Sequence, residues 1–187
     1  QELLEAANLA ESWENVQMQE GSSALTATGQ AISRQFLQLS PRCCYRLSAQ
    51  INPKQNTYFF LGLVPYDREK RRIESRFFHI QPKSDTVLTA ACKSDDRTIL
   101  VENAQSWQAG KKSWLAFDCD PSGFFNDLPN FSVVPIVIEK KEKLENGNWR
   151  LQLQDPIGKD AAAGTAIRQH FGYGVYMYAG RSAVLLK

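Results

Sequence analysis

The fold class follows from the stretch between residues 136 and 153, which contains Ile136-Val137-Ile138-Glu139, Asn146-Gly147-Asn148 and Trp149-Arg150-Leu151-Gln152-Leu153. In its last segment apolar and polar residues alternate, which is the period of a strand with one buried face. Asn146-Gly147 supplies the positive backbone angles that a tight hairpin turn requires. The stretch therefore predicts a β-hairpin.

Strand patterns continue on both sides of this hairpin. Tyr45–Ile51 alternates, and Tyr58–Val64 is a nearly continuous apolar run, as in a central strand. Pro65-Tyr66-Asp67 ends that run, and the charged residues up to Arg72 predict a turn before a further strand, Ile73–Ile80. Only Gln1–Asn15 has a loosely helical pattern, and a short irregular segment is the alternative. Further strands are predicted at Thr86–Ala91, Thr98–Val101, Trp114–Phe117, Val133–Lys143, Trp149–Gln154, Val175–Tyr178 and Ala183–Leu186.

Short strands separated by Gly, Pro, Asn and Asp are typical of a sandwich or a barrel. The segment 84–169 contains its own compact set of strands, with glycine-centred turns at Ser106–Gly110 and Ala162–Thr165. We therefore expect residues 1–187 to form a single all-β unit. Its fold would be a jelly-roll-like β-sandwich with an inserted small β-barrel-like region at 84–169.

Composition narrows the classes of function. The 187 residues are 43% hydrophobic and 22% charged, which is ordinary for a globular protein. The formal net charge is only +2 and the basic residues are scattered, so a nucleic-acid partner is not expected. No apolar run approaches the roughly 18 residues that a membrane span needs. Neither a GxGxxG motif nor a phosphate-binding loop occurs, so no nucleotide cofactor is expected.

Several features favour a secreted, extracellular protein. The sequence begins at Gln1 without Met or an apolar leader, which suggests a processed protein or an excised domain. Asn130-Phe131-Ser132 is a sequon for N-glycosylation. The cysteines form no CxxC pair, which disfavours zinc, and one or two disulfides are expected among Cys43, Cys44, Cys92 and Cys119.

The run Asp118–Asn130 concentrates side-chain oxygens around two adjacent aromatic residues. The spacing of Asp118, Asp120 and Ser122 before Gly123 matches the first half of a calcium-binding loop. Position twelve is Pro129 instead of the usual bidentate Glu, and Asp127 is the residue that could replace it. The alternative is a turn in which Asp and Ser side chains cap backbone amides. A structural Ca²⁺ ion is therefore a candidate cofactor.

Three segments carry a resemblance to a known family: Ser40–Ala49, Gly62–Asp67 and Tyr176–Tyr178. They resemble jelly-roll carbohydrate-binding modules, which are accessory domains of bacterial polysaccharide-degrading enzymes. In those modules an L-x-P-G-x-x-Y-x-L-S phrase introduces a core strand, and this chain has Pro41-Arg42 where Pro-Gly is usual. The resemblance covers the outer portions of the chain, and it implies the fold more than any particular sugar.

Sugar sites pair exposed aromatic rings with polar side chains, because a pyranose has an apolar face and a rim of hydroxyls. Exposed rings are expected at Tyr66, Trp107, Phe124, Phe125 and Tyr173, which lie in or beside turns. The first predicted ligand-binding patch is Phe124, Phe125, Asn126 and Asp127, and the second is Tyr66, Asp67 and Trp107.

We therefore expect a non-catalytic, lectin-like protein that binds glycans. The main alternative is an extracellular protein-interaction or adhesion domain, in which the same exposed rings contact another polypeptide. A polysaccharide-degrading enzyme is the third hypothesis. The Asp residues show no recognisable catalytic pair, and the two histidines, His79 and His170, accompany no Gly-x-Ser-x-Gly motif.

Overall fold

The structure is a computed structural model that describes residues 12–18, 25–40, 42–46, 57–59, 62–172, 177–178 and 184–186. The chain divides into two compact units, residues 1–46 and 47–187. In the described ranges every regular element is a β-strand, apart from short stretches of 3-10 turn, which confirms the all-β class. No helix in this part of the chain is long and apolar enough to cross a membrane.

The first unit contains one antiparallel pair, β1 (Trp13–Met18) and β2 (Leu25–Ser33), with an irregular register between Glu14 and Val16. The helical pattern predicted over Gln1–Asn15 is wrong for its described end, because residues 13–15 belong to β1. Residues 1–11 lie outside the described part. The predicted strand Tyr45–Ile51 is described only at Tyr45 and Arg46, which are not in a strand.

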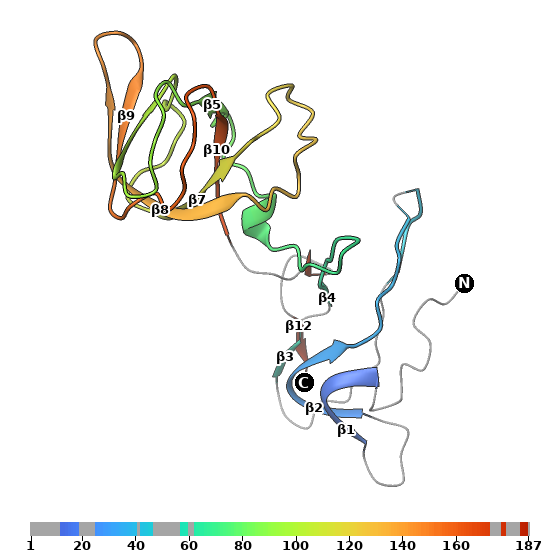
Figure 1. Cartoon of the computed structure of the whole chain (residues 1–187). Helices are drawn as coiled ribbons and strands as arrows, with labels where there is room; N and C mark the ends of the chain where they lie inside the picture. The colour runs from blue at the N-terminus through green and yellow to red at the C-terminus, as the bar shows by residue number, and fades with distance from the viewer. Residues whose placement is uncertain are drawn as a thin grey trace. The chain divides into compact units, whose positions relative to one another are not determined.

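In the second unit, two short pairs join segments that are far apart in sequence (Figure 1). Strand β3 (Thr57–Phe59) pairs with β12 (Val184–Leu186), and β4 (Gly62–Leu63) pairs with β11 (Met177–Tyr178). The predicted central strand Tyr58–Val64 is therefore two short strands in two separate sheets. The predicted strands near the C-terminus are confirmed in their described residues.

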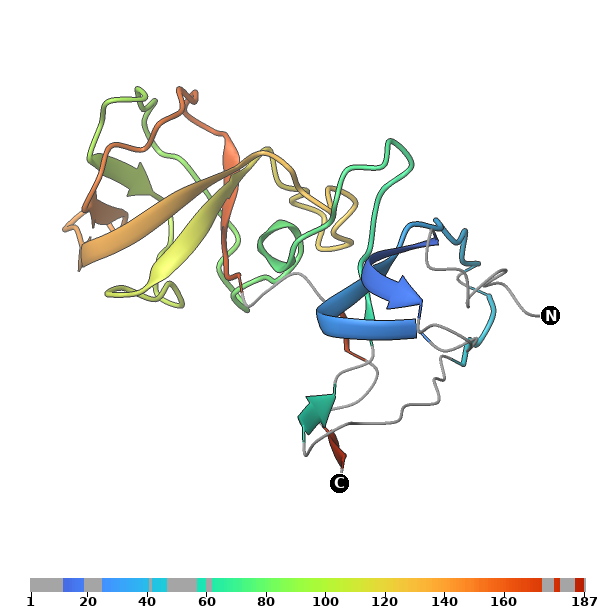
Figure 2. The ribbon, with the colours of Figure 1, turned by 90° about the horizontal axis from the view of Figure 1, so that it is seen from below.

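A six-stranded antiparallel sheet draws all its strands from residues 86–170, in the order β5-β10-β7-β8-β9-β6. The sheet is strongly curled (Figures 1 and 2). Leu88, which follows β5, forms a bridge with Val101 of β6, and Thr89 N donates to Leu100 O at 2.9 Å. The strands are β5 (Thr86–Val87), β6 (Thr98–Val101), β7 (Lys112–Phe117), β8 (Val133–Lys143), β9 (Trp149–Leu153) and β10 (Ala166–His170).

The predicted hairpin is confirmed as β8 and β9. Its turn uses a different geometry from the expected one, because only Gly147 has a positive φ, of 88°. Gly147 N donates to Leu144 O at 3.0 Å, which closes a four-residue turn. Asn146 contributes through its side chain, whose oxygen accepts from Asn148 N at 3.1 Å. The Asn-Gly pair therefore places the hairpin correctly through one backbone angle and one side-chain hydrogen bond.

The inner face of the curled sheet encloses an apolar core. Alternate residues of β9 and β6 point inward, as the period of two requires. Each fully buried Leu, Ile or Val side chain contributes about 1.5–3 kcal/mol through removal of apolar surface from water. The core includes Leu88, Ile99, Val101, Leu115, Phe117, Ile136, Ile138, Leu151, Leu153, Ile157 and Ile167.

Strand β10 carries a polar sequence and was missed by the sequence analysis. Arg168, Gln169 and His170 are all fully buried. Arg168 lies opposite Ala116 of β7, and His170 lies opposite Trp114. Because opposite residues in an antiparallel pair share a face, Arg168, His170 and Trp114 lie together on the outer face of the sheet.

Two segments cover part of that outer face. One is the 3-10 turn η2 (Ser75–Phe77), and the other is the loop 118–130, hereafter the crest loop. The two are joined by a hydrogen bond from Asn130 N to Phe77 O at 2.8 Å. The strand predicted at Ile73–Ile80 is therefore wrong: within it only Ile80 forms a bridge, because the backbone groups of η2 bond locally and to the crest loop and β10.

Candidate functional site

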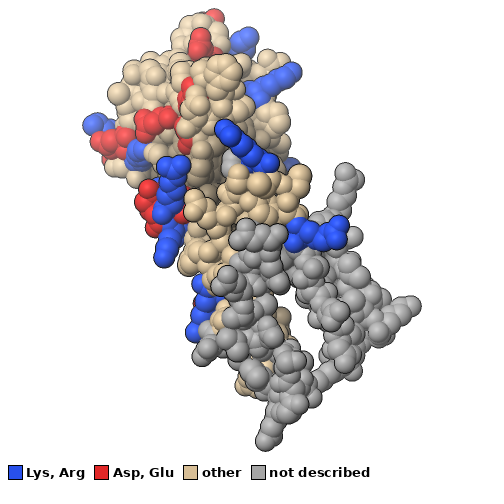
Figure 3. Space-filling view, turned by 90° about the vertical axis from the view of Figure 1, so that its right-hand side faces the viewer, with Lys and Arg blue, Asp and Glu red and all other residues tan. Residues whose placement is uncertain are grey.

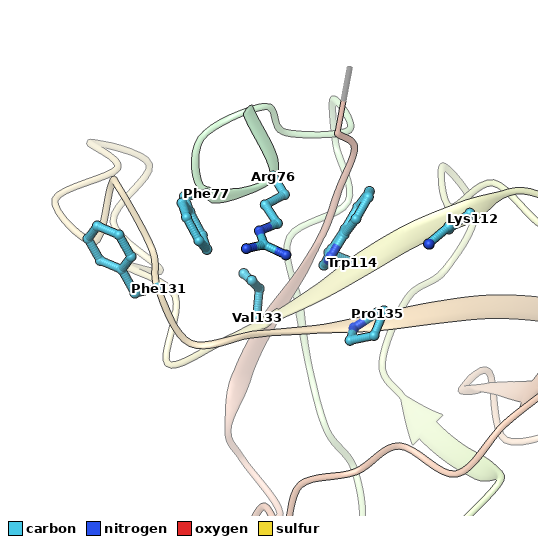
Figure 4. A pocket seen from close by; sticks show the side chains of 7 residues that line it. All are labelled: Arg76, Phe77, Lys112, Trp114, Phe131, Val133 and Pro135. Atoms are coloured by element: carbon cyan, nitrogen blue, oxygen red, sulfur yellow. The ribbon is translucent and has the colours of Figure 1, made fainter. Parts of the chain in front are cut away.

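An open groove lies on the outer face of β7 and β8, where the cover of η2 and the crest loop ends. Trp114 lies opposite Pro135 of β8, and Lys112 follows on the same face two residues away. The groove has a volume of about 370 Å³. Its lining residues are Arg76, Phe77, Lys112, Trp114, Phe131, Val133 and Pro135 (Figure 4).

Three aromatic side chains from different segments form the walls of this groove. Phe77 of η2 and Phe131 of the chain after the crest loop have ring centroids 4.7 Å apart, tilted by 46°. The half-buried indole of Trp114 lies against Gly172, where an added Cβ would stand 2.8 Å from two of its ring carbons. Gly172 therefore sets the position of the indole, since any larger residue would push it.

Two cationic side chains lie on either side of Trp114. Figure 4 shows the guanidinium of Arg76 between the rings of Phe77 and Trp114, with Lys112 beyond the indole. The Cζ atom of Arg76 is 4.8 Å from the Phe77 ring centroid, and Nζ of Lys112 is 6.0 Å from that of Trp114. Nε of Arg76 lies 2.9 Å from Oε2 of Glu74, an ion pair whose geometry is too poor for a hydrogen bond. The groove therefore combines apolar rings with positive charge.

The excess of positive charge at the groove does not extend over the surrounding surface. On the face of the molecule shown in Figure 3, basic and acidic side chains are interspersed over the described surface. At the Phe131 end, Cζ of Arg71 lies 4.1 Å from the ring centroid, and Arg71 is itself paired with Asp67 at 2.6 Å. The second predicted patch is thus linked to the groove through Arg71, which stacks on Phe131.

Beneath the crest loop, the fully buried Arg168 is the centre of a charge network. Its Nη2 donates to Oδ2 of Asp127 at 2.6 Å, and its Nη1 donates to Oδ1 of Asp85 at 3.2 Å. Asp127 also accepts from Asn130 Nδ2 and from Asp120 N. Burial acts to raise the pKa of Asp127, but these hydrogen bonds and the charge of Arg168 outweigh it and lower the pKa. The network ties the crest loop to β10.

His170 ties η2 to the same strand. Nε of Arg168 can only donate, so Nε2 of His170 accepts at 3.1 Å and Nδ1–H donates to Arg76 O at 2.8 Å. The ring is therefore neutral, with its proton on Nδ1. Burial lowers the pKa of His170, and the charge of Arg168 acts in the same direction, against the hydrogen bond to Arg76. The backbone of the groove residue Arg76 is thus anchored by a buried imidazole.

Asp120 organises the crest loop from within. Its carboxylate accepts from the hydroxyl and the N–H of Ser122, and from the N–H and side-chain amide of Asn126. The hydrogen bond from the Ser122 hydroxyl is the largest cause that lowers the pKa of Asp120, to about 2. These contacts match the alternative interpretation of the run, in which Asp and Ser cap backbone amides.

The predicted calcium ligands are engaged in other contacts. Asp120 bonds within its loop, Asp127 pairs with Arg168, and the exposed Asp118 pairs with Lys159 at 3.5 Å. Among the described residues, no group of three or more His, Cys, Asp or Glu side chains is placed to share a metal ion. The residues as they are arranged therefore do not fit a calcium ion without breaking hydrogen bonds, and the ion stays a prediction.

The first predicted ligand patch is divided by the structure. Phe124 is 81% exposed at the tip of the crest loop, whereas the Phe125 ring packs 5.2 Å from the Arg168 guanidinium. Asn126 and Asp127 point into the loop and the network described above. Of the two rings, Phe124 is the more exposed, since Phe125 is 40% exposed.

The second predicted patch is divided as well. Tyr66 is partly exposed and forms a bridge with Arg72, and Asp67 accepts from both N and Nε of Arg71. The expected exposure of Trp107 is wrong: the ring is 2% exposed in the core, and its Nε1–H donates to Ser84 O at 2.8 Å. A turn position did not imply exposure here, because the Trp107 ring packs into the core cluster and its N–H has a backbone acceptor. Tyr173 lies outside the described residues.

The expected disulfides are wrong as well, since all four cysteines are free thiols. Cys92 and Cys119 are buried at different places in the second unit, and burial raises the pKa of the Cys119 thiol to about 12. The sequon residue Asn130 is 5% exposed, and its Nδ2 donates to Phe117 O and Asp127 Oδ2. A glycan on that nitrogen would not fit this arrangement.

A second, smaller cavity of about 180 Å³ lies between the start of β5 and the crest loop. Its lining is mainly apolar, and its acidic groups, Asp85 and Asp120, are the ones already bonded to Arg168 and to the loop. We therefore regard the groove as the better candidate site.

Sequence reasoning missed the groove residues Arg76, Phe77, Lys112, Trp114 and Phe131. One signal was available, because Lys112 and Trp114 lie two apart in a strand and so share a face that a charged residue marks as wet. The contribution of η2 carried no such signal.

No family model, curated protein or solved structure matches this chain.

Proposed function

We propose that this protein is a non-catalytic carbohydrate-binding protein and that its ligand occupies the groove at Trp114. The observation that supports this proposal is the meeting of three aromatic rings and two cations around one open cavity of about 370 Å³. Rings accept the apolar face of a pyranose, and cationic donors bind its hydroxyl oxygens. The site needs no covalent chemistry.

The proposed binding surface is held in place before a ligand arrives. Trp114 is fixed between its strand and Gly172, and the backbone of Arg76 is anchored by His170. Binding to a preorganised site loses less conformational entropy than binding to a mobile one. A rigid groove of this kind suits the modest affinity and shape selectivity of a lectin.

The finer parts of the fold belong to the same proposal. We propose a jelly-roll-like arrangement for the outer portions of the chain, a barrel-like insertion at 84–169, and a secreted location. The all-β architecture and the meeting sheet edges at Leu88 and Val101 support the barrel-like part. The resemblance of the outer segments to carbohydrate-binding modules supports the rest.

An enzyme is less well supported. A glycosidase acid needs a carboxyl whose pKa is raised. The two carboxylates that Arg168 brings together are Asp85 and Asp127, and the pKa of Asp127 is lowered. Such a carboxylate suits a structural ion pair better than proton donation.

Titration calorimetry against a panel of oligosaccharides tests the proposal. We expect millimolar or tighter binding to at least one glycan, and a loss of about tenfold or more in affinity for Trp114→Ala, because stacking on an aromatic anchor dominates such sites. Phe124→Ala is the matched control, since it removes an exposed ring outside the groove. Absence of binding at millimolar concentration across diverse glycans would contradict the proposal.

A protein-interaction domain is the second candidate, and one observation favours it. Phe124 is an exposed ring on a loop whose backbone is held by Asp120, and rigid exposed aromatics are frequent anchors of protein interfaces. Affinity capture with the wild type, Phe124→Ala and Trp114→Ala separates the two functions. Loss of a specific partner with Phe124→Ala alone would favour the interaction domain.

Calcium is tested independently of either function. A ligand that binds only the folded protein raises its melting temperature by mass action. If calcium binds the crest loop, adding it to chelated protein should raise the midpoint, and Asp118→Asn should reduce that rise. An unchanged midpoint in protein confirmed to be metal-free would leave the loop as a hydrogen-bonded turn.

A further inference from the structure

We infer that the groove selects anionic saccharides, whose carboxylate or sulfate group binds Arg76 or Lys112 at one edge of Trp114. The inference rests on the proposed function and names the class of its ligand. Figure 4 shows Arg76 on one side of Trp114 and Lys112 on the other. A sugar on the indole therefore presents its substituents to a cation at either edge.

The lining of the groove is electrically unbalanced. Two of its seven residues are basic and none is acidic. Glu74 approaches Arg76 at Nε, so within the described part of the chain the two terminal nitrogens of the guanidinium have no carboxylate partner. The ammonium of Lys112 likewise has no ion pair with any described residue and lies near the Trp114 ring. The free donors of both cations are therefore available to a ligand.

The chemistry of these donors favours a ligand that carries charge. A guanidinium offers parallel N–H groups that match the two oxygens of a carboxylate or sulfate. A neutral sugar that covers the groove would remove water from both cations without replacing it by an opposite charge. An anionic sugar compensates this cost, and the aromatic walls then select the ring that bears the anion.

Matched oligosaccharides test the inference by calorimetry. The probes are hexamers of galacturonic, glucuronic and mannuronic acid and their methyl esters. The neutral and the sulfated hexamers are those of the parent sugars, galactose, glucose and mannose. We expect at least one acid or sulfated hexamer to bind about tenfold or more tightly than its neutral counterpart, as charge-assisted hydrogen bonds predict. The uronate and sulfate arms identify which group supplies the charge.

Lys112→Gln provides the mutational arm, because this residue is exposed and its substitution is not expected to disturb the fold. It should reduce the ratio of charged to neutral affinity several-fold, and Arg76→Gln should reduce it further. Lys140→Gln is the matched control, because it removes an exposed lysine of β8 that does not line the groove. If Arg76→Gln does not fold, the ratio of charged to neutral affinity measured for Lys112→Gln still tests the inference.

The possible failures are distinguishable. Neutral and charged hexamers that bind equally would overturn this inference and leave the proposed function intact. Absence of binding by every saccharide would overturn the proposed function, and this inference with it. Unchanged selectivity in Lys112→Gln and Arg76→Gln would show that another part of the molecule recognises the anion.

Discussion

The two faces of the same three strands, β7, β8 and β10, are buried by opposite chemistry. The inner face packs aliphatic side chains such as Leu115, Ile136 and Ile167 against one another. The outer face buries Arg168 and His170 under the crest loop and η2, and beyond that cover it opens into the groove. Apolar burial stabilises without regard to direction, whereas a buried ion needs a partner at each donor.

This difference separates stability from positioning. The inner face packs the core and would tolerate other apolar residues of similar volume. On the outer face the contacts are directional hydrogen bonds. Arg168 holds the crest loop through Asp127, and His170 holds η2 through the carbonyl of Arg76. The polar face thus places the walls of the candidate site, and the apolar face supports it. Four experiments can break or sharpen this comparison.

The largest effect is expected from Arg168→Met. It leaves Asp127 partly buried without its cation, and breaking a buried pair in this way costs about 3–5 kcal/mol. Urea unfolding measures the loss. Arg150→Met is the matched control at an exposed arginine of β9, where a change within about 0.5 kcal/mol is expected. A loss below about 1 kcal/mol for Arg168→Met would mean that the network adds little to stability.

Leu115→Ala is the corresponding substitution on the inner face. Removing a fully buried Leu side chain should cost about 3 kcal/mol, from lost burial and the cavity that remains. The comparison is sharpened by amide hydrogen exchange. Leu115→Ala should lower protection throughout the six strands, whereas Arg168→Met should lower it first in residues 118–130. The same exchange pattern in both variants would contradict the proposed division of roles.

A smaller effect is expected from pH, through His170. Its pKa is lowered in the folded state, so below about pH 6.5 the unfolded chain binds more protons. The stability contributed by the neutral ring is therefore present above that pH and is lost as the pH falls through the folded-state pKa. In His170→Asn the decline in unfolding free energy between pH 7 and pH 5 should be weaker.

The exposed His79 offers the control for this experiment, because it is the other histidine of the chain. His79→Asn should keep the wild-type pH dependence. An equal decline in the wild type and in His170→Asn would contradict the lowered pKa of His170, because it would mean that the ring binds protons equally in the folded and unfolded states or that other groups govern the decline.

The smallest effect is expected at the tip of the crest loop. Phe124→Ser removes a ring that is 81% exposed, so the unfolding free energy should change by no more than about 0.5 kcal/mol. Phe125→Ser should cost more, because the Phe125 ring covers Arg168. Urea unfolding of both variants compares two adjacent aromatics that the sequence does not distinguish. Equal losses would contradict the packing of Phe125 on the network.

Strands with one apolar face were predictable at the level of single residues. Thr98–Val101 and Val133–Lys143 have the predicted bounds, and β9 ends one residue early, because period-two alternation reports directly on a buried face. Strand β10 was not predicted, because Arg168-Gln169-His170 is polar on both faces. Such a sequence becomes a strand only when each polar group finds a partner.

The candidate site was predictable only in part. The crest loop was expected to carry function, and the structure gives it the position beside the groove but turns most of its polar groups inward. Arg76 and Trp114 both line the groove although they are 38 positions apart in the sequence, and no local sequence pattern relates them. Trp107 and Trp114 look alike in sequence, yet one is core and the other lines the groove.

By itself, the sequence determined the all-β class, the β8–β9 hairpin and most of the strands that enclose the core, because alternation and turn chemistry act between neighbouring residues. Only the tertiary structure decided which polar residues are buried and which aromatics are exposed. Those outcomes depend on partners brought from distant segments, as Asp85 and Asp127 are brought to Arg168. The free energy of a buried charge is set by these partners and not by its neighbours in the chain.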